Sequence, residues 1–168
     1  PLVRGFVDAS DTATATLTVM GQKVQLTSGT GFSDRRACVS ATTSPCTPIT
    51  TADGLVSTTV SGTTTSTTTA GSYVTVHGFL FDGTSTDVIA TLVSVGDAPT
   101  GSSPANFKAE GVATVAAGAV SINGLKLDLS KATCRAGGAP VNCTTAFANG
   151  DVVSAGAAAA PKLPATVL

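Results

Sequence analysis

Hydrophobic and polar side chains alternate with a period of two along much of this chain. In residues 125–129 (LKLDL), the three leucines fall on one face of an extended backbone. In residues 73–80 (YVTVHGFL), Val74, Val76 and Leu80 share one face, and the aromatic and polar side chains share the other. Since strict alternation is typical of half-buried antiparallel strands, both segments are predicted to be β-strands.

Turn-forming pairs separate the alternating segments. Asn123-Gly124, Asp82-Gly83 and Asn149-Gly150 supply residues that accept positive φ at a tight hairpin turn. Thr, Val, Gly and Ala are abundant, whereas strong helix formers such as Glu, Lys, Gln and Arg are scarce. Short strands need to hide their edges, so the sequence predicts an all-β protein built of small closed or nearly closed barrels.

The first half of the chain is repeated in the second half. Gly5 and Gly21 of the first copy align with Gly111 and Gly124 of the second. The matched segments are 3–10 with 109–116, 18–38 with 121–134, 70–81 with 148–159, and 89–95 with 164–168. A seam rich in Gly, Pro and Ser lies between the copies, as is usual for a linker. We therefore expect two tandem small antiparallel β-barrel or sandwich domains, at residues 1–97 and 107–168, with a linker at 98–106 and a Thr-rich insertion in the first domain.

Residues 71–95 (GSYVTVHGFLFDGTSTDVIATLVSV) place Gly at turn positions and Val at alternate strand positions. This pattern resembles a tandem small-barrel, OB-like repeat domain of unknown function found in exported bacterial proteins. The resemblance covers most of both copies, and it implies tandem barrels and export from the cell. The second copy departs from the pattern, because GDVVSAG is one residue shorter than GSYVTVHG. The family has no established catalytic residues, so the resemblance assigns none here.

The four cysteines form two pairs at equivalent places in the two copies. Three connectivities are possible, and the repeat selects Cys38–Cys46 and Cys134–Cys143, so that each domain has a local disulfide. Zinc binding is the alternative, but spacings of eight and nine residues do not match a zinc knuckle. Disulfides imply an oxidising compartment, so the protein is expected to be secreted, at the bacterial cell surface or beyond it.

The low charge of the chain excludes some partners and favours others. Only 11% of the residues are charged and the net charge is -1, so no basic stripe is available to bind nucleic acid. No run of 18 apolar residues exists, so no membrane span is expected. A surface this poor in charge is weakly protected against association, which favours binding to copies of itself.

No constellation of residues predicts catalysis, a metal or a cofactor. His77 is the only histidine, and it is either a general base or a polar-face strand residue; no G-x-S-x-G motif accompanies it. Asp82 and Asp87 resemble part of a calcium loop, but the positions of that loop that need acidic or amide ligands hold Ser or Thr, so a hairpin turn explains them better. Arg35 and Arg36 form a small positive spot that binds an acidic group, pairs with Asp34 or Asp53, or is simply solvated. We therefore expect no enzyme.

Two stretches are candidates for glycosylation. Asn142 begins the acceptor triplet NCT. The run SGTTTSTTTAG is either a carrier of O-linked sugars or an exposed polar loop. Its candidate acceptors are Thr63, Thr64, Thr65, Thr67, Thr68 and Thr69.

Both ends of the chain have the composition of apolar strands. These ends either complete their own barrels or pair with a neighbouring subunit, and head-to-tail pairing of that kind makes filaments. The candidate self-assembly residues are Leu2, Val3, Phe6, Val7, Leu163, Val167 and Leu168. We expect a structural subunit of an extracellular bacterial filament, a pilus-like fibre, or of a surface assembly. It polymerises non-covalently through strand pairing and apolar stacking, and its expected partners are copies of itself and surface glycans. The alternative is a monomeric cell-surface or periplasmic module that binds a sugar or a peptide.

Overall fold

A computed structural model describes residues 1–61, 66–80 and 87–159, and for residues 57–61 and 66–70 it describes the backbone alone. The strands of the first half are β1 (Leu2–Asp11), β2 (Thr16–Val19), β3 (Gln22–Gln25), β4 (Gly31–Asp34), β5 (Val56–Ser61), β6 (Ser66–Gly71), β7 (Tyr73–Leu80) and β8 (Val88–Gly96). Those of the second half are β9 (Phe107–Ala116), β10 (Ala119–Ile122), β11 (Leu125–Lys126), β12 (Cys134–Ala136), β13 (Ala139–Val141) and β14 (Val152–Ala157). Two 3-10 helices, η1 (Ala37–Ser40) and η2 (Ala52–Gly54), lie between β4 and β5.

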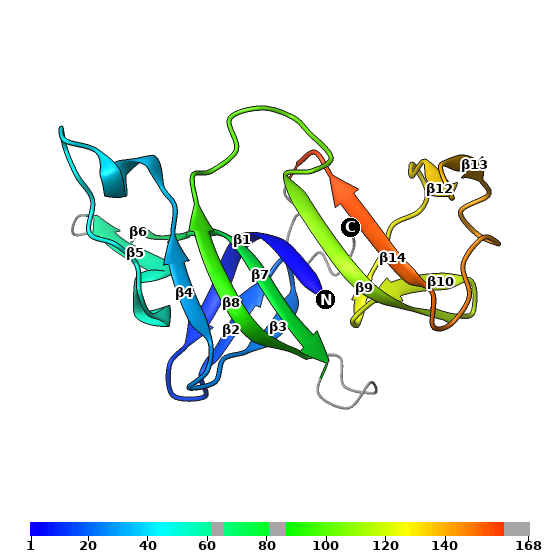
Figure 1. Ribbon diagram of the computed structural model, residues 1–168, viewed down its shortest axis with the longest axis horizontal. Coiled ribbons are helices and arrows are strands. Elements are labelled where there is room, and N and C mark those ends of the chain that lie inside the picture. The colour runs from blue at the N-terminus through cyan, green and yellow to red at the C-terminus, as the bar shows by residue number, and fades with distance from the viewer. Residues whose placement is uncertain (62–65, 81–86, 160–168) are drawn as a thin grey trace.

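Five strands of the first half close into a barrel (Figure 1). Strand β1 pairs antiparallel with β2 and with β7, β2 with β3, and β7 with β8. A parallel pairing of β3 with β8 completes the ring, and β4 continues along the same edge of β8. The predicted all-β class is therefore confirmed, with one closed five-stranded barrel.

The barrel core is filled by the inward side chains that the alternation predicts. On β7, Val74 and Val76 are fully buried whereas His77 is exposed. On β1, Val3 and Val7 point inward. The other fully buried side chains of this core are Leu17, Val19, Val24, Leu55, Val88, Val93 and Val95. Burial of this apolar surface is the main favourable term for so small a domain.

The second half repeats the strand pattern of the first. Strand β9 pairs with β10 and with β14, as β1 pairs with β2 and with β7, and β10 pairs with β11 as β2 does with β3. At the aligned glycines, an added Cβ at Gly5 would stand 2.5 Å from the Met20 side chain, and one at Gly111 would overlap Asn123. Each of those two residues begins a hairpin turn at positive φ, 50° at Met20 and 49° at Asn123, so the predicted turn at Asn123 is confirmed.

The two halves meet through their first strands. Val3 of β1 lies opposite Ala109 of β9, which is its equivalent in the repeat, and Leu2 and Arg4 lie opposite Glu110 and Lys108. The antiparallel pairing thus has local two-fold symmetry. Figure 1 shows the amino-terminal end of β1 at this junction, between the barrel and β9.

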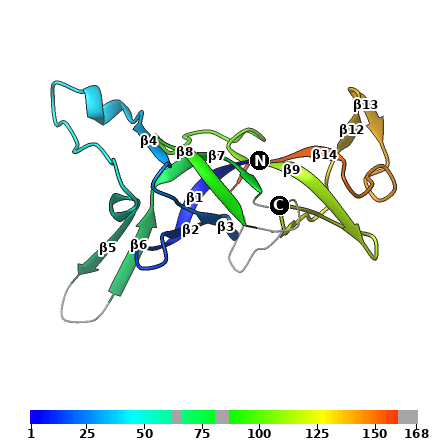
Figure 2. The same ribbon diagram turned by 60° about the horizontal axis from the view of Figure 1, so that its bottom comes forward.

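The second half is not a closed barrel within the described residues. Strand β14 has one paired edge, toward β9, and β11 has one, toward β10. The hairpins β5–β6 and β12–β13 project at opposite ends of the molecule (Figure 2). The domain limits at 1–97 and 107–168 stay a prediction, with β8 ending at Gly96 and β9 beginning at Phe107.

Both predicted disulfides are confirmed. Cys38, within η1, joins Cys46, and Cys134 joins Cys143 across the β12–β13 hairpin, with Cα atoms 5.3 Å and 5.2 Å apart. They are consistent with an oxidising, extracellular compartment. Of the helices in the part of the chain that the structure describes, none has the length and apolarity to cross a membrane.

The first disulfide loop is held to the barrel by Asp34. Its carboxylate accepts hydrogen bonds from Arg36 Nη2 at 2.6 Å and from the backbone N–H of Ile49 at 2.8 Å, and its side chain is only 2% exposed. Arg36 also donates to the carbonyl of Thr47 at 3.0 Å. The sequence left Asp34 and Asp53 as possible partners of Arg35 and Arg36. In the structure, Asp34 forms an ion pair with Arg36.

This ion pair predicts an acid-sensitive contribution to stability. The hydrogen bond from Arg36 lowers the pKa of Asp34 from 3.8 to about 2. A carboxylate with a depressed folded-state pKa contributes stability that is complete above its unfolded pKa and is lost as pH falls through the folded pKa. We expect Asp34→Asn to lower the free energy of unfolding by about 2 kcal/mol at pH 7 and by much less near pH 2, in urea titrations at both pH values. Exposed Asp53→Asn is the control, and a loss for Asp34→Asn that is equal at both pH values would refute the linkage.

Candidate functional site

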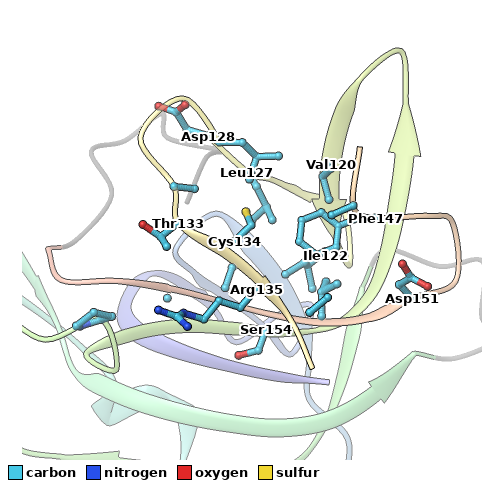
Figure 3. Close-up of a pocket in the computed structure, with 18 of the residues that line it drawn as sticks. Val120, Ile122, Leu127, Asp128, Thr133, Cys134, Arg135, Phe147, Asp151 and Ser154 are labelled. Carbon is cyan, nitrogen blue, oxygen red and sulfur yellow. The ribbon is translucent and has the colours of Figure 1, made fainter. Parts of the chain in front are cut away.

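A groove of about 890 Å³ opens in the second half of the molecule. Its walls are β14 on one side and residues 127–137, which follow β11, on the other. Figure 3 shows Leu127, Ile122, Val120 and the ring of Phe147 among the side chains that line it. The groove is therefore built from elements of the second copy, apart from Pro104 just before β9.

The floor of the groove is apolar. Ile122 is fully buried beneath it and packs with Ala109 and Leu125. Val153 and Ala155 of β14 are half-buried against that cluster. The rim carries charges of both signs, with Asp128, Lys131, Arg135 and Asp151 among the lining residues (Figure 3). Such a site offers apolar burial and backbone pairing.

The first copy shows which element occupies the equivalent position. In the barrel, β8 lies between β7 and β3, and its side chains Val88, Val93 and Val95 fill the core. The counterpart of β7 is β14, which forms one wall of the groove, and the counterpart of β3 is β11, which leads into the opposite wall at Leu127. An extended segment placed there would bond to the free edge of β14 and bury alternate side chains on Ile122, as in strand addition.

An exposed apolar pair lies on β14 and β9. Val152 is 84% exposed, and it lies across the strand pair from Val112, which is 43% exposed. The lining of the groove includes Val152 as well as Val153, whereas Val112 lies outside it. Val112 therefore supplies a control for tests of the groove.

The structure places the amino-terminal assembly candidates inside the chain's own fold. Val3 and Val7 are 1% and 3% exposed in the barrel core, and Leu2 pairs with both β7 and β9. The ring of Phe6 packs edge-on against Tyr73 at 5.4 Å. These four residues are therefore engaged within the subunit. Leu163, Val167 and Leu168 lie outside the described residues.

The glycosylation candidates are only partly described. Thr63, Thr64 and Thr65 lie outside the described residues, and the structure gives only the backbone of Thr67, Thr68 and Thr69, in β6. Asn142 is exposed, and its Oδ1 accepts hydrogen bonds from the N–H and hydroxyl of Thr144 at 2.9 Å and 2.7 Å. That hydrogen-bonded turn explains the Asn-Cys-Thr sequence locally.

The remaining candidates lie apart from the groove. His77 is exposed on β7, Asp82 lies outside the described residues, and Asp87 forms an ion pair with Lys23 at 3.0 Å. The described part of the chain holds no group of three or more His, Cys, Asp or Glu side chains that could bind a metal ion. Arg35 and His77 line a second, smaller pocket on the barrel.

Comparisons of this chain with protein-family models, with curated proteins and with solved structures found no match. The resemblance to an OB-like repeat domain therefore stays a prediction, and function is argued from the surfaces of the molecule.

Sequence reasoning missed the groove itself. Leu127 belongs to the alternating segment 125–129, and Val153 and Ala155 belong to the segment matched with 70–81. Neither pattern says which part of the molecule lies over these side chains. The shortness of the second copy was the available signal, because a shorter repeat has less chain with which to close a barrel.

Proposed function

We propose that this protein is a structural subunit that polymerises outside the cell, with the groove of one copy receiving an apolar strand from the next. The observation that carries the proposal is the open position between β14 and the segment after β11. In the first copy that position is filled by β8. The five-stranded barrel and the two disulfides support a small, export-compatible building block of the OB-like kind.

The inserted strand is proposed to be residues 160–168 (APKLPATVL) of a neighbouring copy. Its last five residues (PATVL) match residues 89–95 in the repeat, which include most of β8, and Thr166 is the one polar residue among them. Insertion into the same chain's groove would give a monomer, and insertion into a neighbour's groove gives an open head-to-tail polymer. A surface with 11% charged residues and net charge -1 offers little repulsion between copies, which favours the polymer.

Charge placed on the groove floor is expected to stop assembly. In Val153→Lys, the ammonium group would have to lose its water when a strand covers the groove, whereas in the uncovered groove it reaches solvent along its flexible stem. We expect polymers of the wild-type chain in light scattering and in negative-stain electron microscopy, and monomers of Val153→Lys. Val112→Lys, at an exposed position of β9 outside the groove lining, is expected to assemble like the wild type.

Far-ultraviolet circular dichroism shows whether both variants are folded. A variant that is folded but monomeric has lost assembly and not its fold. Leu127→Lys, on the other wall of the groove, provides a second variant outside any strand. If folded Val153→Lys and Leu127→Lys still polymerise, the groove is not the assembly site. A wild-type chain that stays monomeric at every concentration would instead support the monomeric binding module.

A further inference from the structure

The outer face of the barrel carries a row of polar side chains that crosses five strands. Lys108, Arg4, Thr75, Ser94 and Ser33 are successive cross-strand partners on β9, β1, β7, β8 and β4. Partners directly opposite each other lie on the same face of a sheet. The five strands lie side by side across Figure 1, from β4 through the barrel to β9. This row does not contribute to the barrel core or to the groove.

Positive charge gathers in the middle of this face. A shallow pocket of about 220 Å³ is lined by Arg4, Arg35 and His77, together with the side chains of Thr75 and Ser94. The lining residues include no carboxylate. With nine Lys and Arg residues among 168, two arginines and the only histidine around one pocket are a local concentration of donors.

The two arginines are held differently. Arg4 is half-buried and is fixed by hydrogen bonds from Nε to Thr75 Oγ1 at 2.9 Å and from Nη1 to the carbonyl of Ala105 at 3.3 Å. The Arg35 side chain is exposed, and within the described residues its guanidinium has neither an ion pair nor a hydrogen bond. The Arg4 guanidinium is thus preorganised, and the Arg35 guanidinium is free to turn toward a ligand and bind it.

The nearest acidic side chains are already engaged elsewhere. Glu110 binds Lys108 at 2.5 Å, and Asp34 binds Arg36. Asp97, beyond the end of β8, accepts the backbone N–H of Ala37 at 3.0 Å. The charge of the Arg4 and Arg35 guanidinium groups is therefore not neutralised from within this face.

We propose that this pocket binds an acidic saccharide through its carboxylate or sulfate group. Arginine forks match planar or tetrahedral oxyanions with paired hydrogen bonds, and the hydroxyl groups of Thr75 and Ser94 suit sugar hydroxyls. Leu92 and the Tyr73 ring give the sugar ring an apolar surface. Nucleic acid fits less well, since it needs a long basic track and several exposed aromatic rings, and Tyr73 is the one aromatic residue in this lining. This site does not rest on the assembly proposed above.

Binding of defined oligosaccharides to the full chain tests this site. The probes are an oligogalacturonate for the carboxylate, a heparin hexasaccharide for the sulfate, neutral maltohexaose, inorganic sulfate and a single-stranded oligonucleotide, followed by isothermal titration calorimetry. We expect at least one of the two acidic saccharides to bind at least ten-fold more tightly than maltohexaose and than inorganic sulfate. The ratio of the dissociation constants of the oligogalacturonate and the heparin hexasaccharide identifies the preferred anion. Arg35→Gln is expected to weaken that binding about ten-fold, since one charged hydrogen-bonded pair is lost.

Lys126→Gln is the matched control, because it removes one exposed positive charge from β11, away from this face. Its binding is expected to stay within two-fold of the wild type. Equal losses in Arg35→Gln and Lys126→Gln would show non-specific attraction and overturn the site. Inorganic sulfate or the oligonucleotide binding as tightly as the acidic saccharides would overturn the saccharide assignment. Because Val153→Lys leaves this face untouched, its saccharide binding is expected to be unchanged even if assembly is lost.

Discussion

Val3→Asp is expected to unfold the first barrel. Val3 is 1% exposed, and its strand is flanked at that position by Val76 of β7 and Ala109 of β9. A carboxylate there would be buried with no cation beside it, a change that typically costs more than about 4 kcal/mol. That loss is a large part of the roughly 5–15 kcal/mol that stabilises a whole domain.

Thermal and urea unfolding followed by circular dichroism measure this effect. Ala9→Asp on the same strand is the control, because Ala9 is exposed beyond the irregularity in the β1–β2 register, and it should unfold like the wild type. Removal of residues 1–7 is expected to act like Val3→Asp, since the strand is shared by the barrel and by β9. If Val3→Asp unfolds cooperatively with the same midpoint as the wild type, the result would mean that β1 is not part of the core.

Gly78→Ala is expected to destabilise the barrel strongly. Gly78 sits where the β7–β8 register shifts, and an added Cβ would overlap the carbonyl oxygen of Ile89 and stand 2.8 Å from Val88 Cγ1. Backbone atoms of a paired strand have little freedom to move away, so the ladder that closes the barrel must separate locally. We expect a loss of about 3 kcal/mol, or roughly 10 °C in the unfolding midpoint.

Gly96→Ala is the matched control in the same strand pair. Its added Cβ would meet only the Tyr73 ring, at 3.9 Å, which is an ordinary contact. Differential scanning calorimetry measures the unfolding midpoint of each variant. The comparison shows the effect of the same added methyl group at Gly78 and at Gly96. Equal midpoints for Gly78→Ala and Gly96→Ala would show that the close approach at Gly78 relaxes without cost.

Local features of the fold could be predicted from the sequence, because they depend on residues that are close together along the chain. The alternation in 73–80 gives the inward face of β7, and the Asn123-Gly124 pair gives a turn that the structure contains, with φ of 49° and 82°. The repeated cysteine spacing gives both disulfides. In each case a residue type is tied to a backbone geometry or a short loop.

Strand partners were not readable, because a period of two says which face is buried and not which strand lies alongside. The parallel pairing of β3 with β8 joins residues more than 60 positions apart, Val24 with Val88. The pairing of Val3 with Ala109 depends on where the linker returns the chain. For the same reason, the sequence did not show whether β1 is buried in the barrel of its own chain or pairs with a neighbouring subunit.

The groove was beyond sequence reasoning for a related reason. Its position follows from comparing the two copies in space, where β8 fills in one half the place that stays open between β14 and residues 127–137 in the other. The sequence repeat alone aligns 89–95 with 164–168, and it does not say whether the second segment serves its own chain or another. That choice decides between a polymer and a monomer.

Cross-linking of a mixture of isotopically light and heavy chains tests that choice most directly. Lys131 lines the groove, and Lys162 lies in the segment proposed to fill it, so a short amine cross-linker can join them once the segment is seated. Strand exchange between copies predicts Lys131–Lys162 cross-links that pair one light and one heavy peptide, in material that light scattering shows to be polymeric. Lys131–Lys162 cross-links found only within light or within heavy chains would contradict the account, because each groove would then be filled by its own chain.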